Sequence, residues 1–348
     1  MSEVLLTGFP GFIGKRLLFY LLEQRLKDSV HLLVHPSMLK LAQDAVASQS
    51  HIQARVHIHA GDITAPDLGL GREAQGLHNS INVIFHLAAI YDLTVPESLA
   101  KKVNVFGTQN MLNFAALCVD LKRFNYISTC YVAGTSKGLF TSQMLEKGQG
   151  FHNFYESTKH EAEILVQKKM NEVPITVFRP AIVVGDSQTG ETDKFDGPYV
   201  VMKFLHQIRF LLRLVPNLGY SHCEVNTIPV DYLVKVLSHL GFEEKAVGKV
   251  YQVCDQTPPT TEEFFEFLVY MMGRFRPYKS SVLKKVILEI LRLKFATKIT
   301  GITRQHLDYF AHEGQFRCQN LLKDLEGTDI QLGCYQDFYP HLYQFMTR

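Results

Sequence analysis

The chain has 348 residues, a formal net charge of +2 at pH 7 and 20% charged residues. This length predicts a large domain with a smaller lobe attached, and the near-neutral charge excludes a global field that would gather nucleic acid. No apolar run reaches the roughly 18 residues that a membrane-spanning helix needs, and the first residues do not resemble a secretory signal. We therefore expect a cytoplasmic protein without a nucleic-acid partner.

The cysteines and histidines do not suggest a cross-linked or metal-binding protein. The six cysteines are scattered without CxxC pairs, which argues against a disulfide framework and a zinc site and fits a reducing compartment. His57 and His59 lie on an alternating strand pattern without HExxH spacing or a third ligand nearby. We therefore expect no metal.

The first predicted elements are a strand, EVLLT, a glycine-rich turn, TGFPGFIG, and a helix. Glycines lack Cβ atoms, so a pyrophosphate could approach the turn, and the helix N-terminus would offer free N–H groups and the positive end of its dipole. The sequence therefore predicts a dinucleotide site, with an ordinary glycine-rich turn as the alternative. Its residues are Gly8, Phe9, Pro10, Gly11, Phe12, Ile13 and Gly14.

The second predicted strand, VHLLVH, ends near His35, where an NAD-selective site would place an acidic residue. His35, Ser37 and Lys40 could instead hold a 2′-phosphate, which favours NADP over NAD. After the third strand, RVHIHA, Asp62 could reach an adenine amino group or simply cap a turn.

The run NVIFHLAAIYD predicts a strand buried on both faces of a parallel sheet. At its end, Ala88 and Ala89 would leave room for a cofactor. Asn104 is expected to open the next helix, NVFGTQNMLNFAALC, as either a buried polar anchor near the active site or a turn residue.

A further strand, FNYI, leads to Ser128 and Thr129, and YESTKHEAEILVQKKM predicts a helix. Residues four apart share a helix face, which places Tyr155 beside Lys159. The ammonium is expected to lower the tyrosine pKa from about 10, giving a proton donor for an oxygen whose carbon has just received hydride. A solvated helix surface is the alternative. Strand alternation predicts that Cys130 points away from Thr129 as a buried thiol rather than an acyl carrier.

The motifs TGFPGFIG, GDIT, HLAAIYD, STCYVAG, YESTK and FRPAIVVGD occur in the order found in the extended short-chain dehydrogenase/reductases. The chain resembles this superfamily from Glu3 to Asp255. The forms FHNFYESTKHEAE and FRPAIVVGDSQTG are most similar to its fatty acyl and thioester reductase branch. The resemblance implies an α/β fold, a Rossmann-like doubly wound parallel sheet with a smaller, mainly helical substrate lobe.

The resemblance also implies residue roles. Thr129, Tyr155 and Lys159 would be the catalytic set, with Ser128 as a substitute for Thr129, and Lys159 would also bind the nicotinamide ribose. Asp62 and Ile63 would hold the adenine. Contacts to the phosphate and ribose region and to the nicotinamide would come from Ala88, Ala89, Pro180, Ile182 and Val183. His35 replaces an arginine that is common in this branch, which leaves NAD open beside NADP.

The expected nucleotide domain comprises residues 1–185 and 222–256, and the substrate lobe comprises residues 186–221 and 257–348. In this lobe VMKFLHQIRFLLRLVP predicts an amphipathic helix, and TPPTTEEFFEFLVYMMG predicts another that begins with a capping box. The segment SSVLKKVILEILRLKFATKI has a narrow polar stripe around Lys285, Glu289 and Arg292. It fits a packed helix, a contact with a membrane surface or acyl chain, or a protein-partner face.

Together these features predict an NAD(P)H-dependent reductase that transfers hydride to a carbonyl, foremost a fatty acyl thioester, to give aldehyde or alcohol. The alternatives are a ketone or hydroxysteroid-type dehydrogenase, a nucleotide-sugar epimerase or dehydratase, and a cofactor-binding protein without turnover. The expected partner is a small, lipid-like or acyl thioester substrate. A homodimer and a peripheral membrane contact are open expectations.

Overall fold

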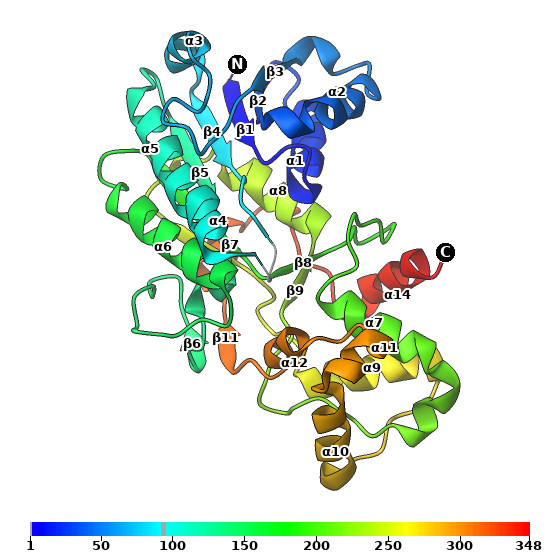
Figure 1. Ribbon diagram of the computed structural model, residues 1–348. Helices are drawn as coiled ribbons and strands as arrows, with labels where there is room; N and C mark the ends of the chain where they lie inside the picture. The colour runs from blue at the N-terminus through cyan, green and yellow to red at the C-terminus, as the bar shows by residue number, and fades with distance from the viewer. Residues whose placement is uncertain (1, 92–94) are drawn as a thin grey trace.

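The computed structural model describes residues 2–91 and 95–348 and contains a seven-stranded parallel sheet in the order β10-β7-β5-β4-β1-β2-β3 (Figure 1). All neighbouring strands of this sheet pair in parallel. The strands are β1 (Glu3–Thr7), β2 (Ser29–Val34), β3 (Val56–Ala60), β4 (Val83–His86), β5 (Arg123–Ile127), β7 (Ile175–Pro180) and β10 (Val250–Val253). The strand order reverses between β1 and β4, which confirms the predicted doubly wound sheet.

Helices cover both faces of this sheet, as parallel strands joined by helical crossovers require. On one face α1 (Phe12–Gln24) and α8 (Val230–Leu240) share an apolar core with the strands, and α2 (Leu39–Ala47) joins the same core. On the other face α3 (Glu73–Ser80), α5 (Gly107–Leu117) and α6 (Phe154–Lys168) share a second apolar core. The sheet is therefore held between two packed layers of helices.

Two predicted elements have different bounds. Strand β4 ends at His86, and the rest of the predicted run leaves the sheet as a loop whose last residue, Asp92, lies outside the described residues. The helix expected to open at Asn104 starts earlier, with α4 (Glu97–Ala100) and a π-helical turn, Lys101–Phe106, that leads into α5. Asn104 therefore lies within a continuous helical segment rather than at its beginning.

The second lobe is helical, as predicted, and has its own core below the sheet (Figure 1). The helix expected over VMKFLHQIRFLLRLVP divides into α7 (Pro198–Gln207) and a 3₁₀ segment, Arg209–Leu214. The segment SSVLKKVILEILRLKFATKI likewise divides into two helices, α10 (Ser281–Leu291) and α11 (Lys294–Thr300). The lobe's other helices are α9 (Thr261–Gly273), α12 (Arg304–Phe310) and α14 (Tyr335–Met346).

Part of the C-terminal region packs with the seven-stranded sheet rather than with the second lobe. Strand β11 (Gly314–Phe316) pairs with β6 (Gly138–Phe140), and α13 (Gln319–Asp324) follows it. Leu321 belongs to the core that also contains α1 and α8. Asp324 accepts hydrogen bonds from Lys249 and Tyr251, each at 2.6 Å, beside β10. The expected lobe boundary, residues 257–348, is therefore interrupted by this return.

A third small sheet pairs β8 (Ile182–Val184) with β9 (Thr227–Pro229) between the main sheet and the second lobe. Among the described residues, no helix combines the length and hydropathy needed to cross a bilayer.

Candidate active site

The glycine turn after β1 meets the loop after β4 at the point where the strand order reverses. The Thr7 hydroxyl accepts hydrogen bonds from the backbone N–H groups of Leu87 (3.2 Å) and Ala88 (3.1 Å). Gly8 has φ +85°, and a Cβ built on it would lie 2.9 Å from the Ala88 nitrogen. Only glycine fits this contact between the two loops.

The other two glycines close the turn onto itself. A Cβ on Gly11 or Gly14 would lie 2.8 or 2.6 Å from the Gly8 carbonyl oxygen, and the Gly11 N–H donates to that oxygen at 3.0 Å. The first turn of α1 contains no acidic residue. A tight, Cβ-free turn at a helix N-terminus fits a dinucleotide pyrophosphate. Phe9 packs into the core, so its side chain faces away from this turn.

The loops after β2 and β3 carry the residues proposed to select the adenosine half of the cofactor. His35 Nδ1 and the Ser37 hydroxyl lie 2.8 Å apart. Asp62 accepts hydrogen bonds from the Thr64 backbone and hydroxyl at 2.8 and 2.9 Å, so the turn-cap alternative holds in the structure. Lys40 instead lies 3.7 Å from Asp44 on the surface of α2.

The electrostatics at Asp62 include a lysine that the sequence patterns did not indicate. Burial raises the pKa of Asp62, but the Thr64 hydrogen bonds and the charges of His35 and Lys102 outweigh it and leave this pKa below its usual value. Lys102 comes from the π-helical turn before α5. A cationic neighbourhood thus surrounds the predicted adenosine contacts.

Helix α6, which carries Tyr155 and Lys159, starts at its N-cap, Asn153, whose side chain accepts from the Glu156 N–H at 3.0 Å. Tyr155 and Lys159 lie one turn apart on this helix. The Lys159 ammonium donates to the Ile127 carbonyl at 2.7 Å and sits 4.3 Å from the centre of the Tyr126 ring. It is buried against the carboxyl end of β5. The solvated-helix alternative is therefore wrong for this lysine.

Tyr155 is half-buried and shares a side-chain hydrogen bond with Thr129. The Tyr155 ring packs edge-to-face against the Tyr91 ring, with 5.0 Å between the ring centres. The structure thus brings the three predicted catalytic residues to one sheet edge. Tyr91, from the loop after β4, is an additional neighbour.

The predicted direction of the Tyr155 pKa shift is wrong. Burial raises the pKa of Tyr155, and the hydrogen bond with Thr129 offsets this only in part. Burial also lowers the pKa of Lys159 to about 7, against a smaller opposing effect of Glu163. Low-polarity surroundings penalise both charged forms, which outweighs the attraction expected between them. Tyr155 is therefore a protonated hydroxyl, as a proton donor must be.

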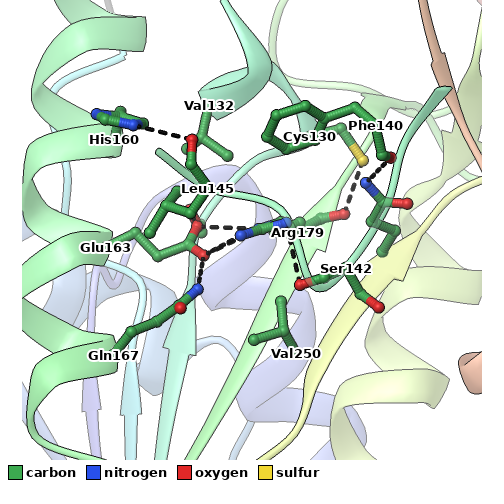
Figure 2. Close-up of polar contacts among 12 residues, drawn as sticks. Cys130, Val132, Phe140, Ser142, Leu145, His160, Glu163, Gln167, Arg179 and Val250 are labelled. Atoms are coloured by element: carbon green, nitrogen blue, oxygen red, sulfur yellow. Dashed lines mark hydrogen bonds and ion pairs between the residues drawn. The ribbon is translucent and has the colours of Figure 1, made fainter. Parts of the chain in front are cut away.

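Ser128 points behind the active site and cannot replace Thr129 there. Its hydroxyl donates to Glu163 at 2.5 Å, and Glu163 forms a fully buried ion pair with Arg179 at 2.6 Å. Figure 2 shows Arg179 reaching from its strand to Glu163, which also accepts a hydrogen bond from Gln167. This network connects β5, α6 and β7 directly beneath Tyr155 and Lys159.

Cys130 is a buried thiol, as predicted, although it begins a 3₁₀ turn, Cys130–Ala133, rather than continuing the strand. Its sulfur donates to the Arg179 carbonyl at 3.0 Å (Figure 2). Next to Arg179, Pro180 ends β7 and its carbonyl accepts from the Thr129 hydroxyl at 3.4 Å. Ile182 and Val183 are half-buried in β8, immediately beyond this edge.

Asn104 is the buried polar anchor that was one of its two predicted roles. Its side-chain oxygen accepts from the Ile90 N–H at 2.8 Å, and its amide donates to the Thr158 hydroxyl at 3.0 Å. These bonds tie the loop after β4 to the catalytic helix. Thr7 and Thr108 are bridged in a similar way by His86, whose pKa is lowered to about 3 by burial and by Lys159.

The second lobe reaches the catalytic helix through α12. The Tyr309 hydroxyl donates to the buried Glu156 carboxylate at 2.5 Å and accepts from Asn153 at 3.1 Å. Other residues of α12, among them Leu307 and Phe310, line an apolar pocket within the lobe. One short helix therefore separates this pocket from the turn of α6 that carries Tyr155. Tyr309 gave no sequence signal, because its partners lie more than 150 residues away.

The predicted absence of metal concerns His57 and His59, which lie at the outer edge of the sheet. His59 Nε2 lies 2.9 Å from His31 Nδ1, and its other ring nitrogen bonds Glu73. Among the described residues, no group of three or more His, Cys, Asp or Glu side chains is arranged to hold a metal ion.

Comparisons with known proteins agree with this geometry. A family model described as male sterility protein, of NAD-binding type, matches residues 6–237. The chain is 27% identical over 279 residues to fatty acyl-CoA reductase wat of Drosophila melanogaster, covering 67% of this chain and 53% of that protein. It is 28% identical over 289 residues to aldehyde reductase lnaA of Aspergillus flavus, covering 75% of this chain and 26% of that protein.

Among solved structures, the terminal R domain from the myxalamid PKS-NRPS biosynthetic pathway has a TM-score of 0.82 at 22% identity. The match covers 100% of this chain and 90% of that chain. The chain thus shares its whole fold with this domain, whereas it spans about half or less of the two curated relatives.

Proposed function

The chain belongs to the male sterility protein family of NAD-binding domains, and we propose that it is an NADPH-dependent reductase of acyl thioesters. The observation that carries the proposal is the meeting of Thr129, Tyr155 and Lys159 at the sheet edge, between the glycine turn and an apolar lobe. The likeness to a protein named fatty acyl-CoA reductase supports the substrate class.

The residues of this edge have separate tasks. The Thr129 and Tyr155 hydroxyls would donate hydrogen bonds to the thioester carbonyl oxygen, where negative charge develops. Reduced nicotinamide cofactor, when bound, supplies the hydride for the carbonyl carbon. Tyr155 then gives its proton to the oxyanion. The hemithioacetal formed from the substrate breaks its C–S bond to release thiol and aldehyde, and a second reduction of the aldehyde would give alcohol.

Lys159 would act as a cofactor ligand and as a charge that assists this proton transfer. With a pKa lowered to about 7, its charge responds strongly to its surroundings. The ribose hydroxyls of a bound cofactor would give the ammonium further acceptors beside the Ile127 carbonyl, and such hydrogen bonds favour the charged form.

We propose NADP as the preferred cofactor, because no acidic side chain follows β2 at the position of His35. His35, Ser37 and Lys102 would face the 2′-phosphate, whereas Lys40 is engaged by Asp44. The chemistry of these donors fits a phosphate better than a pair of ribose hydroxyls.

The runner-up is a dehydrogenase of hydrophobic ketones, which would use the same three residues without a thioester. The apolar pocket beside α12 suits either substrate, but it argues against the polar pocket that a nucleotide sugar would need. The Tyr309 bridge from this lobe to α6 supports turnover over a purely cofactor-binding role, since it joins the lobe to the catalytic helix.

The test is to mix the protein with NADPH and offer a long-chain acyl thioester, a hydrophobic ketone and a nucleotide sugar in turn. Absorbance of the reduced cofactor should fall only with the thioester. One free thiol should appear per NADPH consumed if reduction stops at the aldehyde, and one per two NADPH if it continues to the alcohol. Consumption with the ketone alone would replace this proposal by the runner-up. The same assay with NADH measures the cofactor preference.

A further inference from the structure

Charge is distributed unevenly along this chain. Residues 274–304 contain nine Lys or Arg residues and one acid, Glu289, whereas the rest of the chain has 27 basic and 33 acidic residues. The excess of positive charge is therefore confined to one stretch of the second lobe. This stretch contains α10 and α11, and α10 lies at the end of the lobe farthest from the nucleotide-binding sheet (Figure 1).

The same stretch exposes large apolar side chains. Seven of those exposed in the described part of the chain fall within the 18 residues from Val282 to Ile299. On α10 they follow a four-residue spacing that places them on one stripe, and on α11 Phe295 and Ile299 are 70% and 62% exposed. We name the α10–α11 face by its apolar members: Val282, Val286, Ile290, Leu293, Phe295 and Ile299.

The opposite side of α10 is packed into the lobe. Leu291 is buried in the core of the second lobe, and Leu288 lines the apolar pocket together with residues of α12. Lys284 lies 3.9 Å from the centre of the Tyr220 ring and donates to the Gly219 carbonyl. The helix is therefore fixed in place, and its apolar stripe is held outward by the packing of the other side.

Some cations of this stretch are neutralised locally and others are available. Arg292 pairs with Glu289 at 2.7 Å, and Arg276 pairs with Glu266 at 3.2 Å. Lys285 and Lys298 are exposed on α10 and α11, beside the apolar stripe. Apolar side chains standing out from a basic surround are the pattern of helices that lie in the headgroup region of a membrane.

We propose that the α10–α11 face binds the surface of an anionic lipid bilayer. Lys285 and Lys298 would meet the headgroups, each favouring binding by an electrostatic attraction that salt screens. Phe295, Ile299 and the α10 stripe would enter the boundary between headgroups and acyl chains. An acidic protein partner could meet the same charges, but an apolar surface at the outer end of the lobe fits a bilayer better than a groove-forming interface.

Binding there would place the apolar pocket on the inner side of the membrane-bound helix. The idea that this pocket receives an acyl chain rests on the proposed function. The binding itself does not, because it needs neither cofactor nor turnover. A failure of the reductase assay would therefore leave this proposal standing, and a failure of membrane binding would leave the proposed reaction standing.

The test is co-sedimentation of the full chain with vesicles of phosphatidylcholine alone or of phosphatidylcholine with phosphatidylglycerol. Binding should be much stronger to the anionic vesicles and should fall as salt is raised. The double variant Lys285→Glu with Lys298→Glu should lower the partition coefficient at least about tenfold. Phe295→Ser with Ile299→Ser should lower it to a similar degree on either vesicle composition.

The matched control is Leu117→Ser with Val119→Ser, which should bind like the wild type. These positions lie at the last residue of α5 and two residues beyond it, and are 63% and 71% exposed. Thermal unfolding of every variant checks that it is folded. Absence of wild-type binding to anionic vesicles would overturn the proposal. Wild-type binding by both the charge variant and the apolar variant would also overturn it. Binding to an acidic acyl carrier protein but not to vesicles would replace the bilayer by a protein partner.

Discussion

Two ionisable side chains one helical turn apart are both held toward their neutral forms. Burial raises the pKa of Tyr155 and lowers the pKa of Lys159 to about 7. Desolvation acts on each residue separately, so their attraction, on which the sequence argument depended, is not what dominates before the cofactor arrives. The hydroxyl is thus protonated and bonded to Thr129, ready to donate.

Tyr155→Phe should lower turnover of the thioester by about 10²–10⁴-fold, because the variant keeps the ring but lacks the proton donor. NADPH affinity should be nearly unchanged, since the contact with Tyr91 is made by the ring. Steady-state kinetics and fluorescence titration of NADPH measure the two quantities. Ser128→Ala is the comparison, because its hydroxyl is engaged by Glu163. Full activity of Tyr155→Phe would remove Tyr155 as the donor.

The depressed pKa of Lys159 should appear in the pH dependence of stability. Between its folded value of about 7 and its ordinary value of 10.5, the unfolded chain binds more protons at this site. The free energy of unfolding should therefore rise with pH in that window. Below it, Lys159 is charged in the folded protein too, and the full cost of burying that charge lowers stability. Relative to Lys159→Met, the free energy of unfolding of the wild type should increase by up to about 4 kcal/mol between pH 7 and pH 10. Urea unfolding of both cofactor-free proteins across this range measures the difference. Parallel pH profiles would show that Lys159 titrates normally.

At this scale, the sequence could indicate residues whose relation is local. Tyr155 and Lys159 are four apart on one helix, so their spacing predicted that they share a face. Thr129 follows a strand end, and its place in the catalytic set was implied by the resemblance. Tyr91 and Tyr309 could not be found in this way, because ring packing and hydrogen bonds join them to α6 across long stretches of chain. The pKa shifts were also beyond reach, because they depend on burial.

At the scale of elements, the buried Glu163–Arg179 pair joins α6 to β7 beneath the catalytic residues. Glu163→Gln should lower the free energy of unfolding by about 3–5 kcal/mol, since it leaves the Arg179 charge buried without its counter-ion. Glu289→Gln, which breaks the exposed pair with Arg292, should cost no more than about 1 kcal/mol. Chemical denaturation of the two variants compares them. If both variants lost only about 1 kcal/mol in free energy of unfolding, Arg179 would be satisfied by other partners, such as the Thr141 carbonyl.

Element types were easier to predict than element ends. The strand over NVIFHLAAIYD stops at His86 because the following backbone turns toward Thr7 and Asn104, whose side chains bond it. The segment SSVLKKVILEILRLKFATKI looked continuous because its apolar spacing is helical throughout, yet Leu293 adopts an extended conformation that separates α10 from α11. Tertiary contacts decided both ends, and no local pattern encodes them.

At the scale of the whole molecule, the doubly wound sheet followed from strand and helix patterns in alternation, but the path of the last hundred residues did not. The C-terminal region was assigned to one substrate lobe, whereas β11 and α13 return to the core that contains α1 and α8 before α14 rejoins the core of the second lobe. Short amphipathic segments such as α13 carry no mark of which core they join. The two lobes are therefore linked repeatedly, by chain crossings and by the bond of Tyr309 to Glu156.

We propose that this return makes α13 part of the predicted nucleotide domain, and adjacent leucines can test the proposal. Leu321 is fully buried against that core, whereas Leu322 is 44% exposed on the same helix. Leu321→Ala should lower the free energy of unfolding by about 2–5 kcal/mol. It should also lower the affinity for NADPH, because the core beside β10 loosens. Leu322→Ala should cost far less, since the helix it lies on is preserved and little apolar contact is lost. Thermal unfolding with and without NADPH measures both effects. A nucleotide site that is indifferent to Leu321→Ala would mean that α13 only covers the sheet, and that the domain is complete without it.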